Sequence, residues 1–158
     1  MMMPLEKYKE MRDFSKTPEP EAEVVDTEPF FVVQEHHASR LHYDFRLLMD
    51  GVLKSWAVPR GVPTQPGVKR LAVQTEDHPV AYGSFEGVIP PGTYGSGKVI
   101  IWDKGKLQIE ERQKDKLVFR LDGNKLHGTY ALVRFKGKEQ NKDDWLLMKV
   151  PGEHKHEK

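Results

Sequence analysis

Residues 41–58 read LHYDFRLLMDGVLKSWAV, and this stretch decides the fold. Apolar and polar side chains alternate over 41–47, which is the period of a β-strand with one buried face. Asp50-Gly51 is a strong hairpin signal, and apolar residues return over 52–58. The stretch therefore predicts two antiparallel strands joined by a tight turn.

The rest of the chain repeats this pattern of short β-rich runs and turns. Further strands are expected at 30–34, 69–75, 97–102, 106–111, 116–121, 126–135 and 144–150. Closely spaced strands without long helices between them favour an antiparallel barrel or sandwich. The segment 77–96 contains four glycines and three prolines, and we expect a long structured or functional loop there.

Both ends of the chain differ from this β-rich body. Pro4, followed by Leu5, Tyr8 and Met11, indicates a short N-terminal helix. A Pro-rich acidic linker with little to bury is expected at 15–29. The expected organisation is a helix and linker over 1–28, a β domain over 29–150 and a polar tail over 151–158.

Length and composition exclude several classes of protein. The chain has 158 residues, which is typical of one domain with its own core. It has no cysteine, which excludes a disulfide scaffold, a cysteine-based zinc or iron–sulfur site and a cysteine nucleophile. Apolar runs are too short for a membrane-spanning helix, and the first residues lack a signal-peptide pattern.

Charge is unevenly spread, although the net charge is only +1. Residues 1–28 carry four basic and eight acidic side chains, and the remaining 130 carry 21 basic and 16 acidic ones. The body is therefore mildly basic. Such an excess suits a polyanionic partner and equally suits a solvated surface.

A candidate metal site lies on the 41–47 strand. His42, Asp44 and Arg46 share one strand face, and His36 just upstream is a candidate third ligand. Two imidazoles and a carboxylate suit a divalent transition metal and leave positions for substrate oxygens. Such a metal can polarise a phosphoryl oxygen and supply a nucleophile. The alternative is a solvent-facing side of an amphipathic strand, with His42 and Asp44 merely hydrogen-bonded.

A second cluster, Glu76-Asp77-His78-Pro79 with Tyr82-Gly83, places a histidine beside acids. His78 is a candidate general acid or base, and the alternative is a turn with an incidental histidine. Basic residues recur near the same segments, at Arg40, Arg46, Lys54, Arg60, Lys69 and Arg70. The guanidinium group of an arginine can bind two phosphate oxygens at once, although most such charged side chains simply lie on the solvated surface.

Over about residues 8–150 the chain resembles the 3′-phosphoesterase domain of bacterial and archaeal DNA ligase D. The motifs that carry the resemblance are Arg12-Asp13-Phe14 with Thr17-Pro18-Glu19-Pro20, Gln34-x-His36-x5-His42-Tyr43-Asp44-x-Arg46, Lys54-Ser55-Trp56-Ala57-Val58-Pro59, Glu76-Asp77-His78-Pro79-x2-Tyr82-Gly83, Phe85-Glu86-Gly87-x-Ile89-Pro90 and Tyr94-Gly95-x-Gly97. Several ordered motifs at matching spacing are far more specific than any single one.

The resemblance implies a compact antiparallel β-barrel with short peripheral helices and a manganese-dependent site. It implies removal of a 3′-terminal ribonucleoside and then of the 3′-phosphate, which leaves a 3′-OH. DNA or DNA–RNA primer–template 3′ ends are the implied substrates. A DNA ligase, a polymerase and Ku become candidate partners in trans, and a cytoplasmic, nucleoid-associated location is implied. With no polymerase or ligase module in the chain, a separate enzyme and an excised domain both stay open.

The resemblance also assigns roles to residues. It implies that the metal ligands are His36, His42 and Asp44. The implied catalytic residues are His78, Arg46, Tyr82, Arg70 and Glu76. The implied substrate-binding residues are Arg12, Asp13, Glu19, Arg60 and Gln34. Arg60 departs from related sequences that often have Lys, which keeps the charge but changes bidentate reach.

Two other classes of function compete with hydrolysis. A non-catalytic nucleic-acid-binding barrel would use the His/Asp row structurally, but it typically shows exposed aromatic side chains on strands and a larger basic excess. A cupin-like metalloenzyme would want a His-x-His pair, which positions 42 and 44 do not supply.

Overall fold

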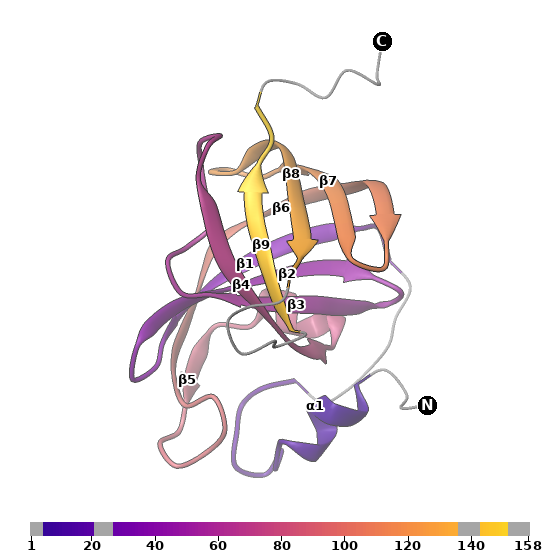
Figure 1. The fold of residues 1–158 in the computed structure, drawn as a ribbon. Helices are drawn as coiled ribbons and strands as arrows, with labels where there is room; N and C mark the ends of the chain where they lie inside the picture. Colours follow the sequence, from indigo (N-terminus) through magenta and orange to yellow (C-terminus); the bar gives the residue numbers. More distant parts are fainter. Residues whose placement is uncertain (1–4, 21–26, 136–142, 152–158) are drawn as a thin grey trace.

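The computed structural model describes residues 5–20, 27–135 and 143–151 (Figure 1). The elements in chain order are α1 (Glu6–Glu10), β1 (Phe30–His37), β2 (Leu41–Met49), β3 (Val52–Val58), β4 (Lys69–His78), the 3₁₀ helix η1 (Val80–Ser84), β5 (Gly87–Ile89), β6 (Gly97–Gln113), β7 (Lys116–Asp122), β8 (His127–Arg134) and β9 (Asp144–Lys149). The expected tail from 152 onward and residues 21–26 lie outside the described residues.

Eight strands close into an antiparallel barrel. The strand order is β1-β2-β3-β4-β9-β8-β7-β6, and β6 pairs back with β1. The short β5 pairs only with β6, outside this closed ring. The expected barrel is thereby confirmed, and the sandwich is excluded because every barrel strand has two partners. The hairpin at Asp50-Gly51 is also present: Met49 and Val52 face one another across the β2–β3 turn.

Two details of the strand pattern differ from expectation. The expected strands at 97–102 and 106–111 form one continuous strand, β6, because its first half pairs with β1 and its second half with β7. Within β6 the buried carboxylate of Asp103 accepts backbone N–H groups of 124–126. The segment 77–96, expected as a loop, also contains η1 and β5.

Two hydrophobic cores stabilise the barrel, one inside it and one on its wall. All eight barrel strands contribute to the interior core, which includes Phe31, Phe45, Trp56, Ala72, Leu107, Phe119, Leu132 and Leu147. The second core packs the leader, which we define as the described N-terminal residues 5–20, together with η1 and β5 against the outer wall. It contains Leu5, Tyr8, Leu48, Val52, Leu53, Tyr82, Phe85, Ile89 and Val99. In Figure 1, α1 and β5 lie beside the same end of the barrel.

The strand register places the polar side chains of Gln34, Asp44 and Arg46 on the outer wall of the barrel. Gln34 pairs with Asp44, which pairs with Ala57, and Arg46 pairs with Ser55. Because the neighbours Phe45 and Trp56 point into the interior core, these side chains point outward. This strand face is therefore not solvent-facing at Asp44 and Arg46, which are 9% and 3% exposed.

The leader packs more closely than the sequence suggests. Residues 15–29 were expected to have little to bury, yet Thr17 and Glu19 are 9% and 5% exposed. The hydroxyl of Tyr8 also donates to the carbonyl of Pro20. The linker expectation is therefore wrong for 17–20, because buried polar contacts rather than apolar burial dock this stretch.

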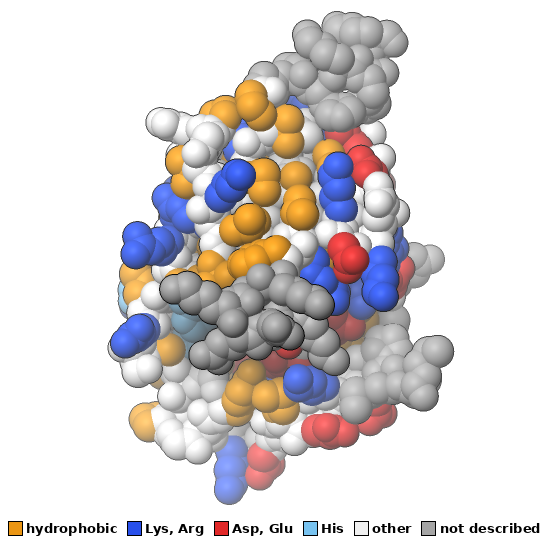
Figure 2. All heavy atoms as spheres, in the orientation of Figure 1, with side chains coloured by type: hydrophobic (Ala, Val, Ile, Leu, Met, Phe, Trp, Pro, Cys, Tyr) orange, Lys and Arg blue, Asp and Glu red, His pale blue; other side chains and the backbone are white. Residues whose placement is uncertain are grey.

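Another part of the outer wall stays uncovered by the described elements. Apolar side chains gather over β4, β8 and β9 in Figure 2, where Leu71 is 42% exposed and pairs with Leu146. No helix in the described part of the chain is long and apolar enough to cross a membrane.

Candidate active site

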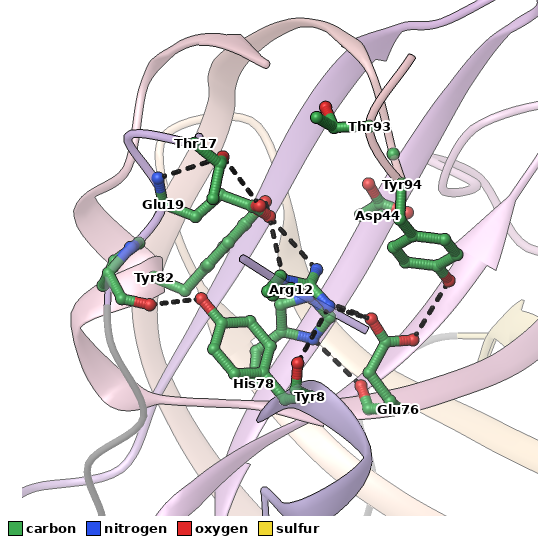
Figure 3. A network of polar contacts seen from close by, with 12 residues as sticks. Tyr8, Arg12, Thr17, Glu19, Asp44, Glu76, His78, Tyr82, Thr93 and Tyr94 are labelled. Atoms are coloured by element: carbon green, nitrogen blue, oxygen red, sulfur yellow. Dashed lines mark hydrogen bonds and ion pairs between the residues drawn. The ribbon is translucent and has the colours of Figure 1, made fainter. Parts of the chain in front are cut away.

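A cavity of about 350 Å³ lies between the barrel wall, the leader and the loop after β5. Of the predicted site residues, the structure brings Arg12, Glu19, His36, His42, Asp44, Arg46, Glu76, His78 and Tyr82 to its lining. These residues come from the leader, β1, β2, β4 and η1, so five separate segments build one site. Figure 3 shows the part of this network around Arg12.

The predicted metal ligands converge at one point of the cavity. Ligand atoms of His36, His42 and Asp44 all lie within 4.8 Å of one another. His36 Nδ1 is 3.2 Å from His42 Nε2, and each ring nitrogen is within 3.4 Å of an Asp44 carboxylate oxygen. Cross-strand pairing of His36 with His42 produces this geometry directly.

Backbone carbonyls set the orientation of both imidazoles. His36 Nε2 lies 2.8 Å from the carbonyl oxygen of Gly95, so a proton there leaves Nδ1 free to accept. His42 Nδ1 lies 3.4 Å from the carbonyl of Arg40, which likewise leaves Nε2 facing Asp44. Two acceptor nitrogens and a carboxylate facing one another fit a divalent cation.

Without a cation, a proton can occupy the same position. The hydrogen bond with Asp44 raises the pKa of His42 above its ordinary value, despite burial. Burial alone would raise the pKa of Asp44, but contacts with His36, His42 and Arg46 outweigh it and hold that pKa below its usual range. A proton and a metal ion therefore compete for one set of atoms.

Arg46 is held rigidly on the cavity wall. Its Nε donates to Gln34 Oε1 at 2.6 Å, and its Nη1 donates to Ser55 Oγ at 2.9 Å. Its Nη2 lies 3.5 Å from Asp44, which directs that end toward the metal-ligand cluster. Gln34 in turn donates to the carbonyls of Tyr82 and Phe85, so it ties Arg46 to η1 from behind.

His78 is buried between two guanidiniums. Its Nε2 is 3.4 Å from Arg12 Nη2, and its Nδ1 is 3.1 Å from Arg46 Nη1 and 2.9 Å from the carbonyl of Glu76. Burial first, and then the charges of Arg46 and Arg12, hold the pKa of His78 well below its ordinary value. The imidazole is therefore neutral near neutral pH.

Arg12 joins the leader to the barrel (Figure 3). Its Nη2 is 3.1 Å from Glu19, and its Nη1 is 3.0 Å from Glu76. The same oxygen of Glu19 accepts the Tyr82 hydroxyl at 2.8 Å. Burial raises the pKa of Tyr82 well above its ordinary value, so this hydroxyl keeps its proton and donates.

Three predicted residues lie apart from this cavity. Asp13 is an exposed cap of its own turn, where it accepts from Ser15 Oγ at 2.6 Å. Arg70 donates to the carbonyls of Arg60 and Gly61, and it shares the strand face of Ala72, which points into the barrel. Neither Arg60 nor Arg70 lines the cavity.

One site residue that the residue-by-residue reasoning missed is Tyr94. Its hydroxyl donates to Glu76 at 3.3 Å, and the guanidinium of Arg12 lies 5.3 Å from its ring centroid. Burial raises the pKa of Tyr94 to about 12, yet the residue remains 47% exposed at the cavity rim. The signal available was its place in Tyr94-Gly95-x-Gly97, directly before the carbonyl that orients His36.

Comparisons with known proteins identify the family to which the chain is similar. Residues 34–134 match the family model described as the DNA ligase D 3′-phosphoesterase domain. The chain is 49% identical over 158 residues to the multifunctional non-homologous end joining protein LigD of Pseudomonas aeruginosa, covering 93% of this chain and 18% of that protein. It is 48% identical over 153 residues to the multifunctional non-homologous end joining DNA repair protein LigD of Mycobacterium tuberculosis, covering 92% of this chain and 20% of that protein. The chain thus spans about a fifth of the length of the curated relatives it matches.

Proposed function

The chain belongs to the DNA ligase D 3′-phosphoesterase domain family, and from that premise we propose that it is a metal-dependent phosphoesterase of DNA 3′ ends. It removes a 3′-terminal ribonucleoside as a phosphodiesterase. It then removes the remaining 3′-phosphate as a phosphomonoesterase and leaves a 3′-OH for repair. A DNA ligase, a polymerase and Ku acting on the same ends are the partners we propose.

The observation that carries this proposal is the convergence of His36, His42 and Asp44 within 4.8 Å, beside Arg46. We propose that these three residues hold Mn²⁺, the metal implied by the family, since their donor set does not itself select manganese. A cation held by these residues would polarise a phosphoryl oxygen and would make water a better nucleophile. The rigid guanidinium of Arg46 then meets charge that develops on the phosphate.

Charge balance supports a requirement for the cation. The cavity lining holds two guanidiniums, of Arg12 and Arg46, and three carboxylates, of Glu19, Asp44 and Glu76. Counting only these five charged side chains, the lining carries one net negative charge, which disfavours a phosphate. A divalent cation held by His36, His42 and Asp44 would reverse the sign of this net charge, and the cavity would then attract a phosphate.

We assign His78 to hydrogen bonding of the phosphate rather than to proton donation by an imidazolium in the resting site. Its low pKa supports this choice, because burial and then the charges of Arg46 and Arg12 oppose its protonation. Tyr82 positions the leader through Glu19, and Gln34 positions Arg46. Each of these two therefore acts through another residue.

Substrate contacts outside the metal cluster are also proposed. Glu76 lines the cavity beside Arg12, where a carboxylate can accept a hydrogen bond from a ribose 2′-OH. The family assignment makes Arg70 catalytic and Asp13 and Arg60 substrate-binding. Because Arg60 and Arg70 do not line the cavity, we propose that any contact of their guanidiniums is to substrate phosphates that lie away from the reacting one. The carboxylate of Asp13 offers no such contact to an anion.

The decisive experiment incubates the protein with Mn²⁺ and three end-labelled primer–templates. The primers end in one ribonucleotide, in a 3′-phosphate or in a deoxynucleotide with a 3′-OH. We expect the first two to be shortened or dephosphorylated and the third to resist, because a site built to bond a hydroxyl discriminates against its absence. EDTA and the His42→Ala variant should each abolish both reactions, and His37→Ala should not.

Each outcome has a definite meaning. If none of the primers reacts while DNA is bound and EDTA leaves binding unchanged, a non-catalytic nucleic-acid-binding barrel replaces this proposal. If only the 3′-phosphate is removed, the phosphomonoesterase assignment stands and the ribonucleoside step is withdrawn.

A further inference from the structure

A second cavity, of about 400 Å³, opens at one mouth of the barrel. It lies where the β2–β3 and β6–β7 turns meet the end of β8 and the start of β9. Its lining includes Lys54, Trp56, Gln74, Arg112, Lys114 and Arg134. None of the functional residues proposed above belongs to it.

The two cavities lie on opposite faces of the same strand pair. Ser55 shares the outward face with Ala57 and Thr75, which line the catalytic cavity, whereas Trp56 and Gln74 line the mouth. Asp77 stands between Glu76 and His78 of the catalytic cavity, and it pairs with Lys54 of the mouth at 3.1 Å.

Cations from three elements converge on this mouth. Lys54 comes from β3, Arg112 and Lys114 from the end of β6 and the turn after it, and Arg134 from β8. Among the described residues, no aspartate or glutamate lines the cavity. The charged side chains of its lining are therefore all cationic, whereas the catalytic cavity is lined by charges of both signs.

Carboxylates outside the lining lie close to three of these cations. Arg112 binds Asp50 with two contacts, at 2.6 and 3.0 Å, and Lys54 lies 3.1 Å from Asp77. Arg134 Nε lies 3.4 Å from Asp115 but makes no hydrogen bond in the described part of the chain. The Arg112 and Asp50 side chains are about half exposed, and exposed pairs of this kind contribute little to stability. A phosphate can therefore exchange for such a carboxylate at small cost.

The floor of the mouth adds a donor that lacks an acceptor. Trp56 is 1% exposed, and its indole N–H has no hydrogen-bond partner in the described part of the chain. The guanidinium of Arg134 lies 4.8 Å from the centroid of the Trp145 ring, which also lines the cavity. A buried donor without a partner is costly unless a water molecule or a ligand supplies the acceptor.

We propose that this barrel mouth binds the phosphodiester backbone of a single-stranded nucleic acid segment. Proteins that bind single strands combine cationic side chains, which contact the phosphates, with aromatic side chains, on which the bases stack. The cavity is of small-molecule size, so it accommodates part of one strand rather than a duplex. This site is separate from the proposed hydrolytic function, and its occupancy does not require hydrolysis.

Tryptophan emission tests the proposal directly. Trp56 and Trp145 lie at the mouth, whereas Trp102 packs against Tyr43 elsewhere. A Trp102→Phe background therefore makes the emission report on the mouth. Titration with an oligothymidylate of about eight nucleotides, in EDTA to prevent turnover, should give a saturable change in emission.

Charge-removing variants locate the binding. Arg112→Ala combined with Lys114→Ala should weaken oligonucleotide binding at least about tenfold and lower the salt slope by about 1.4, as expected for two lost phosphate contacts. Lys104→Ala combined with Lys125→Ala removes the same charge from exposed positions outside the mouth and should change affinity less than about twofold. Unchanged emission spectra before titration verify that both variants remain folded.

Several results would overturn the proposal. No saturable emission change, or equal weakening by both double variants, removes the site. Saturation by inorganic phosphate at the same concentration shows a simple anion site instead. Equal binding of a short duplex rules out the single-stranded assignment. Loss of binding in the Arg112/Lys114 variant, with 3′-phosphate hydrolysis on a short primer unchanged, supports the mouth independently of the catalytic proposal.

Discussion

Arg12 and Glu76 stand 64 positions apart in the sequence and form a 3.0 Å ion pair whose side chains are 4% and 3% exposed. The same guanidinium binds Glu19 with two nitrogens, at 3.1 and 3.2 Å. One cation thus neutralises two buried carboxylates, one from the leader and one from β4. This contact couples docking of the leader to the integrity of the catalytic cavity.

Replacing Arg12 should destabilise the protein strongly. Arg12→Ala leaves Glu19 and Glu76 buried without their cation, so the free energy of unfolding should fall by roughly 3 kcal/mol. Arg12→Lys should recover only part of the lost free energy of unfolding, because an ammonium group cannot bind both carboxylates with the geometry of a guanidinium. Urea denaturation measures the stability of both variants. Lys16→Ala is the control, because the Lys16 side chain is 69% exposed and its ion pair with Asp13 is a loose contact of 3.9 Å. Wild-type stability in Arg12→Ala would contradict the coupling.

Removal of a metal ligand should be visible without any substrate. Mn²⁺ at about 100 times its dissociation constant should stabilise the wild type by about 2.7 kcal/mol, because it binds the folded state alone. His36→Ala, His42→Ala and Asp44→Ala should each lose this stabilisation. His37→Ala should keep it, since His37 is exposed and points away from the cluster. Thermal denaturation with and without Mn²⁺ measures the effect, and equal shifts in all four variants would exclude the site.

The buried neutral His78 should make stability depend on pH. Its pKa is about 6.5 in the unfolded chain and well below that when folded. Below pH of about 6.5 the unfolded chain therefore binds a proton that the folded protein does not, so stability falls as the pH decreases. The slope from this group is at most about 1.4 kcal/mol per pH unit.

The variant His78→Asn isolates this contribution. Its free energy of unfolding should fall less steeply than that of the wild type as the pH decreases from 7 toward 5, as denaturant titrations at several pH values would measure. Parallel pH profiles of the two proteins would mean that His78 is charged in the folded state.

Deletion of residues 1–28 should affect catalysis more than the barrel. The deletion removes Arg12 and Glu19 from the cavity, but all side chains of the interior core remain. We expect hydrolysis of a 3′-phosphate primer to fall by at least about 100-fold, given the loss of buried charged groups at the site. The near-ultraviolet circular dichroism of Trp56 and Trp145 should persist. Equal activity of the shortened protein would show that the leader is dispensable.

Local periodicity determined much of the fold and the centre of the site. Alternation over 41–47 and the Asp50-Gly51 turn predicted the β2–β3 hairpin, because a strand's side-chain period and a turn's dihedral angles are properties of neighbouring residues. The same alternation placed His42 and Asp44 on one face. The register of one hairpin then sufficed to bring His36 to them.

Tertiary structure alone decided what covers that face. The sequence pattern of a strand with one polar face is the same whether water or another segment covers that face. The local sequence therefore could not predict that Asp44 and Arg46 are buried. Arg12 with Glu76, and the carbonyl of Gly95 with His36, are contacts over 64 and 59 positions that exist only once the barrel is closed and the outer core has packed. Barrel closure likewise joined 97–113 into one strand, because pairing with β1 and β7 outweighed the turn propensity of Asp103 and Gly105.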